Sequence, residues 1–286
     1  MTRINMHLKK LVKIKVLIGL IIILSLISES INAQGNLLIT PKRVVFEGNK
    51  RTEELNLANT GTDSASYVIS FIQIKMTDDG KFEQITEPDS TLKIASSNLR
   101  FFPRSVTLAP NEAQSVKVQL IKSNSLEDGE YRSHLYFRGI PNNNKALGEE
   151  NSKKDEGISV KITPIFGLTL PIIIRKGDPT LEMNISDMTL FFTPEKEPFV
   201  KFKLNRTGNI SSYGDIIVNY ISNSDAVTRV ALIKGLAVYT PNLLREISLK
   251  LDESQTIDWH SGKIEVIYFD NGSQTKKLAE NSLKLN

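Results

Sequence analysis

The chain has 286 residues, with 36 Lys and Arg, 32 Asp and Glu, and no cysteine. Five of the basic residues and one of the acidic residues lie within the first 33, so the remainder carries 31 of each and no net charge, which argues against a nucleic-acid partner. The absence of cysteine excludes disulfides and a lipid-modified N-terminal cysteine, so a hydrophobic core must hold the fold together.

Residues 1–33 have the pattern of a signal peptide. Basic residues precede an apolar run at 16–27, and the segment 28–33 offers a small residue for cleavage after Ala33. The apolar run is shorter than the roughly 18–20 residues that cross a membrane, so we expect a cleaved signal and an exported protein. An uncleaved signal anchor is the alternative.

Short apolar or alternating runs, separated by turn residues, recur along the rest of the chain. Seven of them precede residue 176, at 37–46, 54–58, 67–76, 105–108, 115–120, 131–140 and 160–175. Seven short strands at this spacing predict an immunoglobulin-like sandwich, and no segment has the long 3.6-residue period of a helix. The polar segment 142–156 interrupts the pattern and is predicted to be a mobile loop.

A second set of runs follows a predicted linker at 176–179. They lie at 181–185, 188–192, 199–205, 215–222, 229–238, 245–251, 262–269 and 274–285. We therefore predict an all-β protein with two tandem immunoglobulin-like β-sandwich domains, at 34–176 and 177–286.

The sequence lacks the patterns that carry catalysis or bind metals. Beyond residue 33 only His134 and His260 remain, and neither has a partner at metal-ligand spacing. There is no Gly-x-Ser-x-Gly elbow, no cysteine nucleophile and no Gly-rich phosphate loop. We expect no enzymatic activity, no cofactor and no small-molecule substrate. A carbohydrate-active enzyme, which needs two converging carboxylates, stays an alternative.

Four segments, in order, resemble the periplasmic pilus chaperones of the PapD type. They are RVVFEG at 43–48, LNLAN at 55–59, PRSVTLAP at 103–110 with VKV at 116–118, and EYRSHLYFRGIP at 130–141. The resemblance covers about residues 37–176, and the second half is similar in architecture only. It implies a periplasmic location, fimbrial or surface subunits as partners, and an outer-membrane assembly protein as a further candidate partner.

The resemblance also implies a binding mechanism. In this family a first-strand arginine, in a cleft between two sandwiches, binds the terminal carboxylate of an incomplete subunit. Arg43 matches that arginine, and a guanidinium can form a bidentate, charge-assisted pair with a carboxylate. On position alone, an arginine that solvates its strand edge or pairs with Glu47 is an equal alternative. The family's second carboxylate ligand, a lysine, falls on Pro171 here, and two further family arginines fall on Thr107 and Gly129.

The same resemblance implies that the last strand of the first domain lends apolar side chains to the subunit. The candidate donor residues, counted by twos along one face, are Ile162, Pro164, Phe166 and Leu168. The face continues through Leu170 and Ile172. For these two and for Leu168, a place in the domain's own core is the simpler interpretation.

Two prolines limit the pairing of this strand. Pro164 and Pro171 are seven residues apart, so in a regular strand their missing N–H groups would point to opposite sides. We therefore predict a bulge or break near Gly167, or pairing that ends before one of the prolines.

Two functions fit these patterns. The first is a periplasmic chaperone that binds fimbrial or surface subunits by β-strand donation. The alternative is a non-catalytic structural or adhesive β-sandwich protein of the cell surface, whose strand edge is covered by its own chain.

Overall fold

The computed structural model describes residues 37–87, 89–121, 125–141, 165–254, 257–271 and 276–285. The predicted signal peptide at 1–33 and loop at 142–156 lie outside these ranges, as do the candidate donor residues Ile162 and Pro164. Within the described residues the chain folds into strands and one 3₁₀ turn, Ser96–Asn98. None of its helices there is long and apolar enough to cross a membrane.

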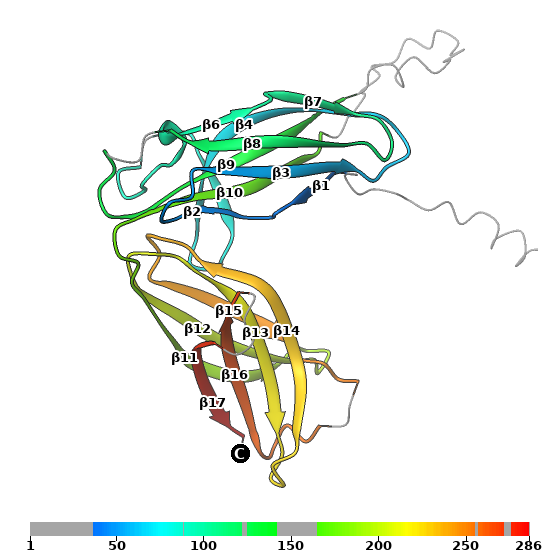
Figure 1. Cartoon of the computed structure of the whole chain (residues 1–286). Helices are drawn as coiled ribbons and strands as arrows, with labels where there is room; N and C mark the ends of the chain where they lie inside the picture. Colours follow the sequence, from blue (N-terminus) through cyan, green and yellow to red (C-terminus); the bar gives the residue numbers. More distant parts are fainter. Residues whose placement is uncertain are drawn as a thin grey trace, which may run out of the picture. The chain divides into compact units, whose positions relative to one another are not determined.

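The first ten strands form two facing sheets, here called the N-terminal sandwich (Figure 1). One sheet has the order β1 (Leu37–Thr40), β3 (Thr52–Asn59), β8 (Ala113–Leu120), β6 (Leu99–Phe102). The other has the order β2 (Val44–Phe46), β10 (Gly167–Lys176), β9 (Gly129–Ile140), β4 (Ala65–Met76), β5 (Phe82–Ile85), and β7 (Ser105–Leu108) also pairs with β4. Alternating residues of both sheets, such as Leu55, Leu57, Leu135 and Phe137, are fully buried between them. The predicted immunoglobulin-like architecture is confirmed.

The predicted first strand at 37–46 is in fact two strands in different sheets. β1 pairs with β3, whereas β2 pairs in parallel with β10. Pro41 lies at the crossover, and because proline has no N–H it cannot extend the β1 ladder. The crossover places Arg43 directly before β2, beside the last strand of the sandwich.

Strand β10 begins at Gly167 and pairs antiparallel with β9 along its whole length. Ile165 and Phe166 lie outside any strand. The segment 160–175 is therefore not one uninterrupted strand, in agreement with the break predicted near Gly167. On its other side β10 pairs with β2 only through Ile172, Ile173 and Ile174.

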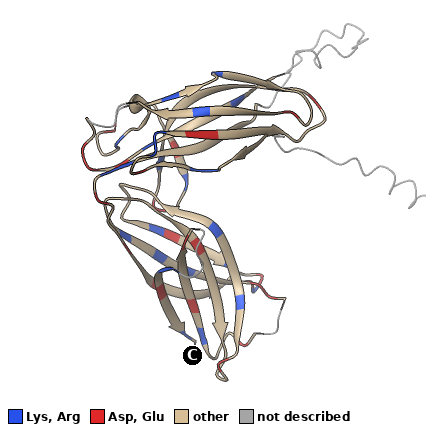
Figure 2. Ribbon diagram, in the orientation of Figure 1, with Lys and Arg blue, Asp and Glu red and all other residues tan. Residues whose placement is uncertain are grey.

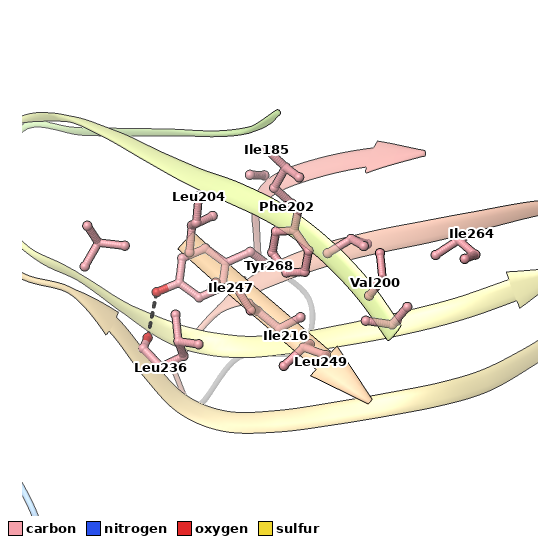
Figure 3. Close-up of a cluster of buried hydrophobic side chains, with 14 of the residues drawn as sticks. Ile185, Val200, Phe202, Leu204, Ile216, Leu236, Ile247, Leu249, Ile264 and Tyr268 are labelled. Atoms are coloured by element: carbon pink, nitrogen blue, oxygen red, sulfur yellow. Dashed lines mark hydrogen bonds between the residues drawn. The ribbon is translucent and has the colours of Figure 1, made fainter. Parts of the chain in front are cut away.

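The remaining strands form a second pair of sheets, the C-terminal sandwich. One sheet has the order β11 (Leu181–Phe192), β12 (Pro198–Gly208), β15 (Leu244–Lys250), and the other β14 (Val227–Val238), β13 (Ser212–Ile221), β16 (Lys263–Asp270), β17 (Lys277–Lys284). Figure 3 shows its core, where the Tyr268 hydroxyl donates to the Leu236 carbonyl at 2.9 Å. The runs predicted at 181–185 and 188–192 are one strand, β11, with a register shift between Ser186 and Thr189.

The sheets change between β10 and β11, where the linker was predicted. Met76 and Ile173 of the N-terminal sandwich nevertheless pack into the core of the C-terminal one, and residues 37–286 form a single compact unit. The division into domains at 34–176 and 177–286 therefore stays a prediction.

Candidate functional site

One row across the sheet contains Arg43 directly before β2, Pro171 of β10 and His134 of β9. Pro171 is paired with His134 in the β10–β9 ladder. Arg43 precedes Val44 as Pro171 precedes Ile172, and Val44 and Ile172 are partners in the parallel pair. Because side chains alternate along strands, all three are on the face of the sheet opposite the buried Leu170 and Ile172.

The Arg43 guanidinium lies against aromatic rings of the C-terminal sandwich. Its Nη1 donates to the Tyr239 hydroxyl at 3.3 Å, and its Cζ lies 4.6 Å from the ring centroid of Tyr213. Its Nη2 is buried and has no hydrogen-bond partner. Glu47 pairs with Arg175 at 3.3 Å, and Arg43 forms no ion pair within the described ranges. The alternative in which Arg43 pairs with Glu47 is therefore wrong, and Nη2 of Arg43 is left without a hydrogen-bond partner.

The row opens into a pocket of about 420 Å³ that gathers positive charge. Its cationic lining residues are Lys42, Arg43, Lys234 and Arg245. None of the described residues that line it is Asp or Glu. Elsewhere Figure 2 shows both signs of charge spread along the strands of each sandwich. A pocket lined by one sign of charge favours an anionic group.

His134 is nearly buried, with 4% of its surface exposed, and its Nδ1 has no hydrogen-bond partner. The ring of Phe82 covers it at a centroid distance of 6.3 Å. Burial, helped by the charges of Arg132 and Arg43, lowers the pKa of the imidazole from its usual 6.5 to about 3. His134 is therefore neutral at physiological pH.

Acid is expected to destabilise the fold through His134. Below pH 6.5 the unfolded chain binds a proton at this imidazole, whereas the folded chain does not until the pH approaches about 3. Stability should therefore fall as the pH falls, by about 2 kcal/mol between pH 7 and pH 5 from this residue alone. Urea unfolding at both pH values, for the natural protein and His134→Gln, measures the difference. An equal pH dependence in the two proteins would contradict it.

A buried carboxylate fixes β9 and β10 beside the C-terminal sandwich. Oε2 of Glu130 accepts hydrogen bonds from Nε of Arg175 at 3.1 Å and from the backbone N–H of Ser211 at 3.0 Å, and Oε1 accepts from the Ser211 hydroxyl. Next to it, the Arg132 guanidinium stacks 4.1 Å from the Tyr239 ring centroid and donates to backbone carbonyls. Desolvation lowers the pKa of Arg132. These contacts join β9 and β10 to Ser211 and to Tyr239, and Tyr239 lines the pocket.

The N-terminal half of β10 is an open strand edge. Gly167–Pro171 pairs with β9 on one side, and no described strand pairs with the other side. The exposed fraction of the side chain rises along the inward-facing row, from 3% at Leu170 to 43% at Leu168 and 53% at Phe166. Leu168 is exposed even though its partner on β9, Phe137, is fully buried. The row of side chains that begins in the core therefore ends with Leu168 and Phe166 exposed to solvent.

The structure divides the predicted site residues between two faces of one sheet. Arg43 lies on the pocket face, and Phe166 and Leu168 belong to the row that faces the core. The core interpretation is correct for Leu170 and Ile172, which are buried, but wrong for Leu168, whose side chain is about half exposed. Sequence reasoning did not assign the pocket residues His134, Tyr213, Tyr239 and Arg245 to a site, because they come together only through strand pairing and packing.

One stretch of the N-terminal sandwich matches a known family. Residues 36–164, which end before β10, match the family described as pili and flagellar-assembly chaperone, PapD N-terminal domain. In this stretch the chain is similar to the PapD-like chaperones, as the four sequence motifs predicted. A search of curated protein sequences found no match.

Solved structures similar to this chain include three chaperones. The CupB2 chaperone of Pseudomonas aeruginosa is 13% identical, with 87% of this chain and 100% of that chain covered and a TM-score of 0.42. The E. coli chaperone DraB is 10% identical, with 87% and 96% covered and a TM-score of 0.43. The class 5 fimbriae chaperone CfaA is 13% identical, with 88% and 99% covered and a TM-score of 0.38. With TM-scores below 0.5, these likenesses add nothing to the assignment.

Proposed function

We propose that this protein is a non-catalytic periplasmic chaperone that binds fimbrial or surface subunits by donating the edge of β10. The family match over residues 36–164 supports a role in pilus assembly. The observation that carries the finer proposal is the open edge at Gly167–Pro171, flanked by the exposed Phe166 and Leu168. An unpaired edge with a half-exposed apolar row is the surface to which another chain adds a strand.

The apolar row and the pocket contact supply similar binding free energies in this proposal. Phe166 and Leu168 are already about half buried, so completing their burial in a subunit would contribute roughly 1.5–3 kcal/mol before ordering costs. One charged hydrogen bond contributes about 1.5–3 kcal/mol. The apolar row therefore adds to the main-chain pairing of the strand, and a contact at the pocket can set the register of the bound strand.

Arg43 anchors the subunit's terminal carboxylate in the same proposal. Its free Nη2 and the cationic lining of the pocket support this role. The Tyr213 and Tyr239 rings hold the guanidinium in place, so little side-chain entropy is lost when it pairs with a carboxylate.

The open edge favours a chaperone over a structural or adhesive surface protein. A surface protein of that kind needs its last strand covered by its own chain. Within the described residues, Gly167–Pro171 has no such cover.

The proposal is tested by purifying the protein from the periplasm of its own host and identifying what comes with it. A secreted subunit should co-purify with the natural protein. Arg43→Glu should reduce its recovery at least tenfold, because a carboxylate then faces a carboxylate. Arg100→Glu is the matched control, since Arg100 is exposed on β6 in the other sheet.

Each outcome has a separate meaning. Undiminished recovery with Arg43→Glu would remove the anchor and leave strand donation in place. Retention of the natural protein on the cell surface, with no subunit bound, would support the structural alternative.

A further inference from the structure

We infer that His134 is the second ligand of the client's terminal carboxylate, facing Arg43 across Pro171. The inference rests on the proposed function, because the carboxylate is that of the bound subunit. It assigns to a neutral imidazole on β9 a role that Pro171 of β10 cannot take, since proline has no side-chain donor.

Both side chains line the same pocket. Arg43 and His134 flank Pro171 on its two neighbouring strands, so their backbones are about 10 Å apart, two strand spacings. Both residues are on the same face of the sheet, and the smaller Pro171 between them lines the pocket as well.

Both flanking residues have a nitrogen without a partner. In the described part of the chain, three buried side-chain polar atoms lack a hydrogen-bond partner, and two of them are Nη2 of Arg43 and Nδ1 of His134. Buried polar groups nearly always have partners, so two such nitrogens on either side of one proline require an explanation. A carboxylate offers one oxygen to each of them.

The charges around His134 couple this binding to pH. Arg132 on its own strand and Arg43 act on the imidazole, and the lining of the pocket adds Lys42, Lys234 and Arg245, the hydroxyls of Tyr213 and Tyr239, and no described Asp or Glu. Burial first, and then these cations, disfavour a proton on the empty site. A bound carboxylate offsets the cations and raises the pKa of His134, so binding becomes tighter as the pH falls toward the pKa of the complex.

The test uses proton NMR of the two histidines of the folded protein, with a synthetic probe. The probe is a peptide of alternating valine and threonine with a free terminal carboxylate, and its control is the same peptide amidated at the C-terminus. The acid should shift the His134 ring signals and raise the pKa of His134, and the amide should do neither. His260, which is exposed, is the internal reference.

Affinity for the same peptides provides a second readout. His134→Leu should weaken binding of the acid about tenfold and leave binding of the amide unchanged, whereas His134→Gln, which keeps an N–H donor, should recover part of the loss. The NMR titration needs no variant, so a folding defect in either variant does not remove the test.

The outcomes separate this inference from the proposed function. The inference is overturned if the protein prefers the acid through Arg43, but the acid does not shift the His134 signals and the His134 variants bind it as tightly as the natural protein does. The Arg43 anchor would then stand. Equal binding of acid and amide overturns the anchor and the inference together. Binding of neither peptide counts against strand donation itself, and with it against the inference.

Discussion

Leu168→Asp is expected to lower subunit binding at least 100-fold while lowering the free energy of unfolding of the free protein by only about 1 kcal/mol. Leu168 is half exposed in the free protein, so a carboxylate there stays hydrated. In the proposed complex the same position is buried, and the variant loses the transfer free energy of leucine and must also desolvate a charge. Phe166→Asp should act in the same way. Subunit recovery from periplasm measures binding, and urea unfolding measures stability.

The matched control is Phe102→Asp. Phe102 is 75% exposed on β6, in the other sheet of the same sandwich, so it tests whether any charge on an exposed apolar residue impairs recovery. Strand donation from β10 would be contradicted if Leu168→Asp and Phe102→Asp retained the same amount of subunit. A loss of about 3 kcal/mol or more in the stability of Leu168→Asp would instead mean that the free protein buries this position fully.

The sequence predicted the sheets well because their residues alternate. β7 was predicted with its observed bounds, and most other strands of both sandwiches to within a few residues. β5 was missed because its residues are largely exposed and carry no apolar alternation. β6 was also missed, although Leu99 and Phe101 alternate with exposed residues, because the run is only four residues long. The split of the first strand at Pro41 was missed because an apolar run does not reveal which sheet each half joins.

The candidate site was less predictable. Arg43 and the end of β10 were found through motifs and counting by twos, which depend on positions close in the sequence. Whether Leu168 is covered depends instead on how far the facing sheet extends. His134 stood in a predicted strand with no distinguishing neighbour, and its place beside Pro171 follows from the β10–β9 register.

Glu130→Ala is expected to lower the free energy of unfolding by about 3–5 kcal/mol, the typical cost of removing one partner from a buried ion pair. The Glu130 side chain is fully buried and accepts from Arg175 and from both the N–H and the hydroxyl of Ser211. Its removal leaves these donors without their acceptor in a site that water does not reach. Glu130→Gln keeps an acceptor without the charge and should cost less, about 1–3 kcal/mol.

Glu47→Ala is the matched control, because Glu47 pairs with the same Arg175 while 48% of its side chain is exposed. An exposed pair of this kind contributes less than about 1 kcal/mol, since water solvates both charges when the pair is broken. Urea unfolding at pH 7 compares the variants under one condition. Equal losses for Glu130→Ala and Glu47→Ala would mean that water reaches Glu130, and that the contact of β9 and β10 with Ser211 does not depend on a desolvated charge.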